Sequence, residues 1–412
     1  MKRIGLVCLG LALGAANTVH AQGLTMQMSN GWNFTFSGNV NTFLYYEKSN
    51  SSGNTATPGG LTPAGAVVSA TRLTVGLLPA FAVFDAKGKE GNTDLGVHFG
   101  FAPNVQCSTG QNDCFGAQID MRQVYLTVGG SWGQLLVGRE LGLYNRQNIL
   151  TDQTLFGIGA TGNGTDTPGD GFGTTLGRIG FGYIYPQFRA QMTYSTPAGR
   201  PYSWAIGLFE AASVGGFTNT YLPRVESEFT YSQSGFKFWL GGTLQSTREF
   251  PTTPGGGSNP SLTGWGGSGG LRYEKAMFSV TGSGYYGKGL GTTLYGIGAT
   301  DGGTVGNDDA RKSYGFIGQV TVTPTGSKVT IAGSYGSSYL KASNTEAKTA
   351  ATDFRTENTL ISGGIYYQAT KSLKVVGEFD YWWTKGKIAG ATPAGQSSNK
   401  QWAPALGFML FF

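Results

Sequence analysis

The last twelve residues of the chain, from Gln401 to Phe412, alternate in character with a period of two. One face of this segment would carry Trp402, Pro404, Leu406, Phe408, Leu410 and Phe412. A period of two indicates a β-strand, and the segment ends on five consecutive apolar residues, from Phe408 to Phe412. A soluble protein gains little from such a strand, whereas a barrel strand that crosses a membrane needs an apolar face with aromatic residues at its ends.

The composition also favours a membrane barrel. Glycine accounts for 69 of 412 residues, and aromatic and charged residues for 13% each, the charged share being about half of the usual quarter. The aromatic content argues against disorder, and the glycines have no period of three that would indicate collagen. Outside the N-terminus no run approaches the roughly 20 apolar residues of a transmembrane helix. A transmembrane β-barrel is the favoured class, with a soluble β-helix or sandwich as the alternative.

The N-terminus has the pattern of a secretory signal. Two basic residues precede an apolar stretch from Ile4 to Ala16, and the ending Val19-His20-Ala21 fits a small-x-Ala cleavage site. We therefore expect a signal peptide over residues 1–21 and a single exported domain over 22–412, the alternative being a short membrane anchor. Loss of Lys2 and Arg3 lowers the formal net charge from +6 to +4, a mild excess that does not indicate a nucleic-acid partner.

The expected mature chain has two cysteines, Cys107 and Cys114, in a polar segment that contains glycine. An exported protein can oxidise such a pair, so the two are candidates for a small disulfide-closed loop. No further ligands stand nearby in the sequence, which argues against a metal site. No cofactor is expected.

Connections between the alternating segments fall into two length classes. Short turns are expected at residues 129–132, 233–235, 274–276, 324–327 and 369–372. Long polar connections are expected at about 47–69, 102–117, 141–175, 248–261, 288–312, 341–356 and 385–399. Short connections at one end and long ones at the other are typical of outer-membrane barrels, whereas a soluble sandwich has no reason to sort its loops.

A first count gives about seventeen strands, an odd number that cannot bring both chain ends to the short-turn side. Between Leu176 and Ser195 the apolar phase changes at Pro186, and proline in a sheet marks an edge, a bulge or a turn. A bulge at Pro186 within one long strand would reduce the count to sixteen. The prediction is therefore an all-β, antiparallel transmembrane barrel of sixteen strands, with short periplasmic turns and long extracellular loops.

The chain resembles the general diffusion porins of Gram-negative bacteria. The resemblance is carried by the order and spacing of Arg72-Leu73-Thr74-Val75-Gly76, Arg122-Gln123-Val124-Tyr125-Leu126, Gly138-Arg139, Met192-Thr193-Tyr194-Ser195-Thr196-Pro197 and the terminal Phe412. It covers the whole mature chain and implies a homotrimer in the bacterial outer membrane, in contact with membrane lipid and lipopolysaccharide. It also implies that Phe412, Leu410 and Phe408 form the signal for the barrel-assembly machinery.

The resemblance further implies that a long loop, residues 141–175, folds into the lumen and narrows the pore. Its acids are Asp152, Asp166 and Asp170. The Pro-Glu-Phe-Gly-Gly stretch usual in the family is absent, and Asp152 is the first choice because the family more often places constriction acids in the early half of this loop. The alternative is a solvated external loop.

Arginines are the candidates for the opposite wall of the pore. Parity alone places Arg72, Arg178 and Arg189 in the lumen, because each is out of phase with its apolar neighbours. The resemblance adds Arg122 and Arg139.

Parity is less clear for these last two arginines. Arg122 is in phase with Val124 and Leu126, and Arg139 has the same ambiguity against Leu135 and Val137. An arginine in lipid at the midplane costs roughly 2–4 kcal/mol. We therefore expect Arg122 to face the lumen, with Tyr125 and Met121 as the residues that could face lipid instead.

These residues predict a channel for passive diffusion of ions and small hydrophilic solutes. A pore acts through the radius and charge of its narrowest ring, and the excess of basic candidates predicts a weak preference for anions; the alternative is that the arginines are wetted without effect. A substrate-specific channel would need an aromatic track, for which Trp239 and Trp382 are too few, and a surface adhesin would lack the sorted loops. An enzyme is not expected, because His98 is the only histidine of the mature chain.

Overall fold

The computed structural model describes residues 23–29, 31–51, 58–62, 69–106, 119–161, 174–214, 217–249, 261–293, 305–306, 309–389 and 396–412. The expected signal peptide and the candidates Cys107, Cys114, Asp166 and Asp170 lie outside the described residues. In the described part of the chain, no helix has both the length and the apolar character needed to cross a membrane.

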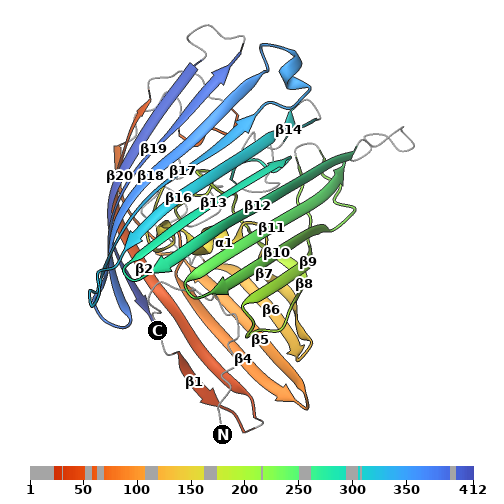
Figure 1. Cartoon of the computed structure of the whole chain (residues 1–412), viewed down its shortest axis with the longest axis vertical. Helices are drawn as coiled ribbons and strands as arrows, with labels where there is room; N and C mark the ends of the chain where they lie inside the picture. Colours follow the sequence, from red (N-terminus) through yellow and green to blue (C-terminus); the bar gives the residue numbers. More distant parts are fainter. Residues whose placement is uncertain are drawn as a thin grey trace.

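Antiparallel strands form one sheet that closes into a barrel, shown in Figure 1. On one side of the closure the sheet contains β1 (Leu24–Gln27), β2 (Asn33–Ser51), β3 (Ser69–Thr74), β4 (Phe81–Glu90), β5 (Thr93–Pro103), β6 (Ile119–Gly130), β7 (Gly133–Leu141), β8 (Phe188–Ser195) and β9 (Tyr202–Phe209). It continues with β10 (Arg224–Gln233), β11 (Phe236–Arg248), β12 (Ser261–Lys275), β13 (Phe278–Lys288), β16 (Lys312–Val322), β17 (Val329–Lys341), β18 (Phe354–Gln368), β19 (Leu373–Ile388) and β20 (Gln396–Phe411). β14 (Val305–Gly306) and β15 (Asp309–Ala310) form a separate hairpin.

The barrel has sixteen strands, as predicted. β2 pairs with β20, which closes the barrel. β3 and β4 pair with two successive parts of β2 and together make one interrupted strand. β1 is an additional short strand that pairs with residues 33–36, beyond the part of β2 that β20 covers.

Short turns and long connections lie at opposite ends of the barrel, as the sequence predicts. Two-residue turns join β4 to β5, β6 to β7, β10 to β11 and β12 to β13. Both ends of the described chain lie on the short-turn side (Figure 1). Since every long connection leaves from the other rim, the strand count and the loop sorting are consistent with each other.

The closing strand β20 has the two faces that its alternation predicts. Leu406, Phe408 and Leu410 are 49%, 53% and 47% exposed on the outer surface, whereas Ala403 and Met409 are fully buried on the inner one. The amide of Gly38 donates to the carbonyl of Phe412 over 2.9 Å, and the amide of Phe412 donates to the carbonyl of Gly38 over 3.1 Å. Exposed Leu, Ile, Val and aromatic side chains continue this surface over the other strands, which is the outer face of a membrane-spanning barrel.

One part of the predicted strand pattern is wrong. Residues 176–187 are not the first half of a long strand, because β8 begins only at Phe188. Phe181, Tyr183 and Ile184 are fully buried inside the barrel, so their alternating apolar pattern reflects packing on the inner wall rather than contact with lipid. The barrel has sixteen strands because this stretch is not a strand, and Pro186 is not a bulge within one.

Candidate functional site

The connection between β7 and β8, residues 142–187, is called here the inward segment, because its described parts lie inside the barrel. It contains α1 (Arg146–Thr151) and the short 3-10 helix η1 (Gln153–Phe156), and Figure 1 shows α1 within the ring of strands. Its described parts are residues 142–161 and 174–187. Because the loop 141–175 and the stretch 176–187 are continuous, the inward segment is longer than the loop expected from the sequence.

Two carboxylates of β10 hold the start of the inward segment. Glu226 Oε2 accepts hydrogen bonds from the backbone amides of Leu143, over 2.8 Å, and Tyr144, over 3.0 Å. Glu228 forms an ion pair with Arg146 of α1, with 2.6 Å between Oε1 and Nη2. Both glutamates are buried, so these charge-assisted bonds form where water does not compete strongly.

A carboxylate of β19 holds the next part of the segment. Glu378 Oε1 accepts from the amides of Ile158, over 2.8 Å, and Gly159, over 2.7 Å, while Oε2 accepts from the Tyr366 hydroxyl over 2.9 Å. A side-chain carbon on Gly157 would lie 2.0 Å from Glu378 Oε2. The close approach of backbone and carboxylate therefore requires glycine at this position.

Glu47 of β2 receives the last described part of the segment before residue 162. The Thr161 hydroxyl donates to Glu47 Oε2, and Gln401 Nε2 of β20 donates to the same oxygen over 3.1 Å. Glu47, Glu226, Glu228 and Glu378 are called here the wall carboxylates. β2 and β19 are separated only by β20, whereas β10 lies in a distant part of the sheet, so the wall carboxylates fix the inward segment to two separate parts of the wall.

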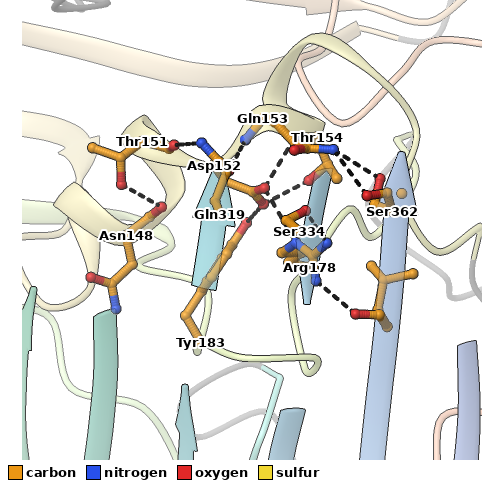
Figure 2. A network of polar contacts seen from close by, with 12 residues as sticks. Asn148, Thr151, Asp152, Gln153, Thr154, Arg178, Tyr183, Gln319, Ser334 and Ser362 are labelled. Carbon is orange, nitrogen blue, oxygen red and sulfur yellow. Dashed lines mark hydrogen bonds and ion pairs between the residues drawn. The ribbon is translucent and has the colours of Figure 1, made fainter. Parts of the chain in front are cut away.

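Asp152 and Arg178 form an ion pair within the inward segment, shown in Figure 2. Arg178 Nε is 3.6 Å from Asp152 Oδ1, and both side chains are 0% exposed. Arg178 also donates from Nη1 to the Leu360 carbonyl of β18, over 3.0 Å, and from Nη2 to the Ser334 hydroxyl of β17. Because Arg178 contacts both Asp152 and the wall, the pair joins the two described arms of the segment to β17 and β18.

Hydrogen bonds to Asp152 complete this network (Figure 2). Asp152 accepts from the Thr154 amide over 3.0 Å, from the Thr154 hydroxyl over 2.6 Å and from the Tyr183 hydroxyl over 3.0 Å. Burial raises the pKa of the Asp152 carboxyl above its ordinary value, while Arg178 and these donors act in the opposite direction. Gln319 of β16 adds a wall contact, since its Oε1 accepts from the Gln153 amide over 2.7 Å.

The enclosure of Asp152 corrects its expected place at the narrowest ring. A carboxylate with no exposed side-chain surface and three donors cannot meet a passing solute. Its role in the structure is to hold the turn between α1 and η1 and to partner Arg178. Arg178 is likewise not a residue of the barrel wall, because it lies on the inward segment and points toward the wall.

Two of the arginines expected in the lumen lie on the inner face of their strands. Arg72 of β3 is on the opposite face from Leu73, which is 62% exposed on the outside. Arg189 of β8 shares its face with buried Gln191 and Thr193, and its Nε donates to Gln187 Oε1 over 2.9 Å. The parity of these strands therefore gave the correct face.

Arg122 also lies on the inner face, for a reason that alternation does not reveal. The pairing of β5 with β6 shifts by one residue, from Gly100 opposite Gln123 to Phe101 opposite Met121. Arg122 is the extra residue of this bulge, so Arg122 and Gln123 are both buried. Met121 is exposed, as expected, but Tyr125 is not a lipid-facing residue, because its ring stacks on buried His98 at 4.5 Å.

Arg139 lies on the outer face of β7, contrary to expectation. It is exposed and in phase with Leu135, also exposed, and with Val137. No register shift interrupts the pairing of β7 with β6 or β8, so alternation holds along this strand. Arg139 is in the last pair of β7 with β6 and two residues before the end of β7, where a long side chain can reach the membrane interface instead of the midplane.

Alternation would also have identified the wall carboxylates, which the sequence analysis missed. Glu226 and Glu228 alternate with Val225, Ser227 and Phe229 in the same way as the arginines alternate with their neighbours. Trp239 and Trp382 do point inward, but they are 1% and 0% exposed. Trp239 Nε1 donates to Asn148 of α1 over 2.7 Å, so this ring supports the inward segment rather than lining an aromatic track.

Remaining titratable groups in the described residues give no metal centre. No cluster of three or more His, Cys, Asp or Glu side chains in this part of the chain has the geometry to hold a metal ion. His98 Nδ1 lies 2.9 Å from Asp85 Oδ1 on the neighbouring strand, a cross-strand pair on the inner wall.

Several solved structures have the same architecture. The outer membrane channel DcaP of Acinetobacter baumannii matches with a TM-score of 0.65 at 14% identity, over 94% of this chain and 99% of that one. OmpT, an outer membrane protein of Vibrio cholerae, matches with a TM-score of 0.56 at 14% identity over 95% and 100%, and its trimer form with 0.51 at 12% identity over 93% and 100%. OmpF of Salmonella typhi in complex with daunomycin gives 0.55 at 12% over 94% and 100%.

These likenesses, at identities far below those of close relatives, establish the fold. It is the fold of outer-membrane porins. No family model matches the chain, and no curated protein matches its sequence.

Proposed function

We propose that the protein is a porin of the bacterial outer membrane that lets ions and small hydrophilic solutes diffuse passively. The observation that carries the proposal is the inward segment, which is fixed inside a closed barrel by the wall carboxylates and by the Asp152–Arg178 pair. A segment that crosses a lumen narrows it, and the charges beside it then determine which solutes pass. Insertion into planar bilayers should therefore give ohmic conductance steps, and a protein that inserts without conducting would contradict the proposal.

A substrate-specific channel is less well supported. Both inward tryptophans that might have formed an aromatic track are buried. An adhesin would not need charged groups that fix a loop inside the barrel. We therefore favour a pore that selects by size and charge over one that binds a particular solute.

The proposed assembly is a homotrimer surrounded by membrane lipid and lipopolysaccharide and inserted by the barrel-assembly machinery. Support for the trimer comes from the trimer form of Vibrio cholerae OmpT, which shares the fold. Three identical pores should close or insert together, so conductance changes in groups of three would support the trimer, and single independent steps would contradict it.

Weak anion preference is part of the proposal, carried by Arg72 and Arg189 on the inner face, since Arg122 is buried and forms an ion pair with Asp120 over 2.8 Å. Replacing Arg72 and Arg189 with glutamine should lower the anion-to-cation permeability ratio by roughly twofold to fourfold. A unit charge about 5 Å from an ion in water contributes roughly 0.8 kcal/mol, and salt in the lumen screens most of this contribution. The reversal potential in a salt gradient measures this ratio.

The matched control is Arg139→Gln, which removes the same charge from the outer face of β7. This variant should leave the reversal potential as in the wild type. An unchanged potential in the double variant would mean that the inner arginines are wetted by the lumen without affecting selectivity.

Deleting Phe412 should lower the amount of assembled barrel more than the stability of the protein once folded. Phe412 makes two backbone hydrogen bonds to Gly38, and its ring lies 5.3 Å from that of Phe36, which is a small part of the whole ladder. The proposed assembly signal, Phe412 with Leu410 and Phe408, would lose its terminal residue. Heat-modifiable barrel in membranes gives the yield, and unfolding of refolded protein gives the stability.

Phe316→Ala is the control for this deletion, since it removes an exposed aromatic side chain from the outer face of β16. It should reduce assembly much less. Normal assembly without Phe412 would count against the signal.

A further inference from the structure

Five basic residues stand directly beside one another on the outer face of the barrel. The antiparallel register pairs Lys288 of β13 with Lys312 of β16, Lys312 with Lys341 of β17, Lys341 with Arg355 of β18, and Arg355 with Lys387 of β19. We call these five residues the basic row. Lys and Arg make up 29 of 412 residues, about one in fourteen, so composition does not account for five in consecutive paired positions.

The basic row lies at the long-loop rim of the barrel. Lys288 and Lys341 are the last residues of β13 and β17, and Lys312 is the first residue of β16. Arg355 is the second residue of β18, and Lys387 is the penultimate residue of β19. These strands are neighbours in the tall wall of Figure 1. They span four inter-strand steps, roughly 19 Å at about 4.8 Å a step. The alternation places all five on the outer face, in phase with exposed Tyr286, Phe316 and Ile361.

The next outward-facing positions toward the membrane are largely aromatic. Tyr286, Tyr314 and Tyr339 occupy paired positions on β13, β16 and β17, and the rings of Tyr314 and Tyr339 stack at 4.9 Å. Lys341 Nζ lies 5.3 Å from the Tyr314 ring centre, and the Arg355 guanidinium lies 4.8 Å from that of Tyr339. Aromatic girdles mark the level where hydrocarbon meets headgroups, so the basic row lies at headgroup level.

Like charges directly opposite one another destabilise a sheet unless an anion lies between them. Among the residues that the structure describes, no salt bridge involves any member of the basic row, while eight join other pairs. The nearest carboxylates along β18 are Asp353 and Glu357, two residues to either side of Arg355, and neither is paired in register with a member of the row. The basic row therefore contains five positive charges, and none of its paired positions holds a carboxylate.

We propose that the basic row binds the phosphate groups of a membrane lipid that carries more than one phosphate. Several phosphates on one headgroup match a line of closely spaced cations, and the apolar surface below the tyrosines would receive the acyl chains. The inference rests on the outer-membrane placement proposed for the protein, in which the long-loop rim meets the outer leaflet. It does not depend on what the pore conducts.

The triple variant Lys312→Gln, Lys341→Gln and Arg355→Gln tests the proposal. Full-length protein folded in detergent is titrated with bisphosphorylated lipid A, and bound lipid is counted by native mass spectrometry. At about 1 kcal/mol, or about fivefold, for each basic residue near a headgroup, we expect roughly hundredfold weaker binding for the three. The dephosphorylated lipid should bind the wild type as weakly as lipid A binds the variant.

The matched control removes three basic residues from the short-turn rim: Lys275→Gln, Lys328→Gln and Lys371→Gln, all exposed. This control should bind lipid A within about twofold of the wild type. Equal binding by the triple variant, an equal loss in the control, or undiminished binding of the dephosphorylated lipid would overturn the proposal. So would inorganic phosphate that competes at concentrations comparable to the lipid, because the ligand would then be a free ion.

Conductance of the triple variant in bilayers without phosphorylated glycolipid separates this proposal from that of the pore. The basic row lies outside the barrel, so channel conductance should be unchanged. If the triple variant loses lipid binding but conducts normally, the proposed lipid site is supported independently of the proposed pore. If the triple variant still binds lipid, the proposed lipid site is overturned, whatever its conductance.

Discussion

Replacing Asp152 with alanine should release the inward segment from the wall and raise the mean channel conductance. The substitution leaves Arg178 buried without its counter-ion, and breaking a buried pair by removing one partner costs about 3–5 kcal/mol. It also removes the acceptor for Thr154 and Tyr183. Arg178 attaches the inward segment to β17 and β18. Without this attachment, the backbone amides of the described residues 142–161 and 174–187 should exchange faster. Single-channel currents should become larger and noisier.

A double-mutant cycle distinguishes the charge pair from its individual hydrogen bonds. Asp152→Asn keeps an oxygen acceptor for Thr154 while it removes the charge, and should lose less than Asp152→Ala. Combining Asp152→Ala with Arg178→Met removes both charges, so the double variant should be more stable than the sum of the single losses predicts. Additive losses would show that Asp152 and Arg178 do not act as a pair.

Alternation in the sequence was sufficient for the barrel and for most side-chain faces. It gave the two faces of β20 and the inner positions of Arg72 and Arg189, because each of these depends only on a period of two within one strand. The count of sixteen strands was correct, but it was reached through a bulge at Pro186, whereas the structure has no strand before Phe188 in this stretch. It failed at Arg122, where one extra residue at the β5–β6 pairing changes the phase. A bulge is a property of two strands and leaves little trace in the pattern of one.

The stretch 176–187 could not be assigned from its own residues. Phe181 and Tyr183 alternate with glycines as in a lipid-facing strand, but their apolar surface is covered by the inner wall. Gly182, at φ +148°, has a backbone conformation that favours glycine, and its amide donates to Ser338 of β17 over 2.9 Å. Parity indicates on which face a side chain lies, whereas the partners of Asp152 and Glu378 depend on how a long loop folds back on distant strands.

The wall carboxylate Glu378 should be the other position where one substitution has a large effect. Glu378→Ala removes the acceptor of the Ile158 and Gly159 amides and of the Tyr366 hydroxyl. Leaving a buried donor unsatisfied costs about 1–3 kcal/mol, so the loss should be about 3 kcal/mol or more. Unlike Asp152→Ala, this change should increase exchange first at residues 157–161, because Glu226 still holds Leu143 and Tyr144.

Two variants define what Glu378 contributes. Glu378→Gln retains an oxygen acceptor beside Ile158 and Gly159 and should restore most of the protection, whereas Glu357→Gln removes the same charge from the outer face of β18 and should leave exchange and conductance unchanged. If Glu378→Ala altered exchange equally throughout the inward segment, the segment would be a single cooperative unit without separate attachments. If exchange did not change, packing of Ile158 and Leu155 against the apolar inner wall, and not the carboxylate, would hold this part of the segment in the barrel.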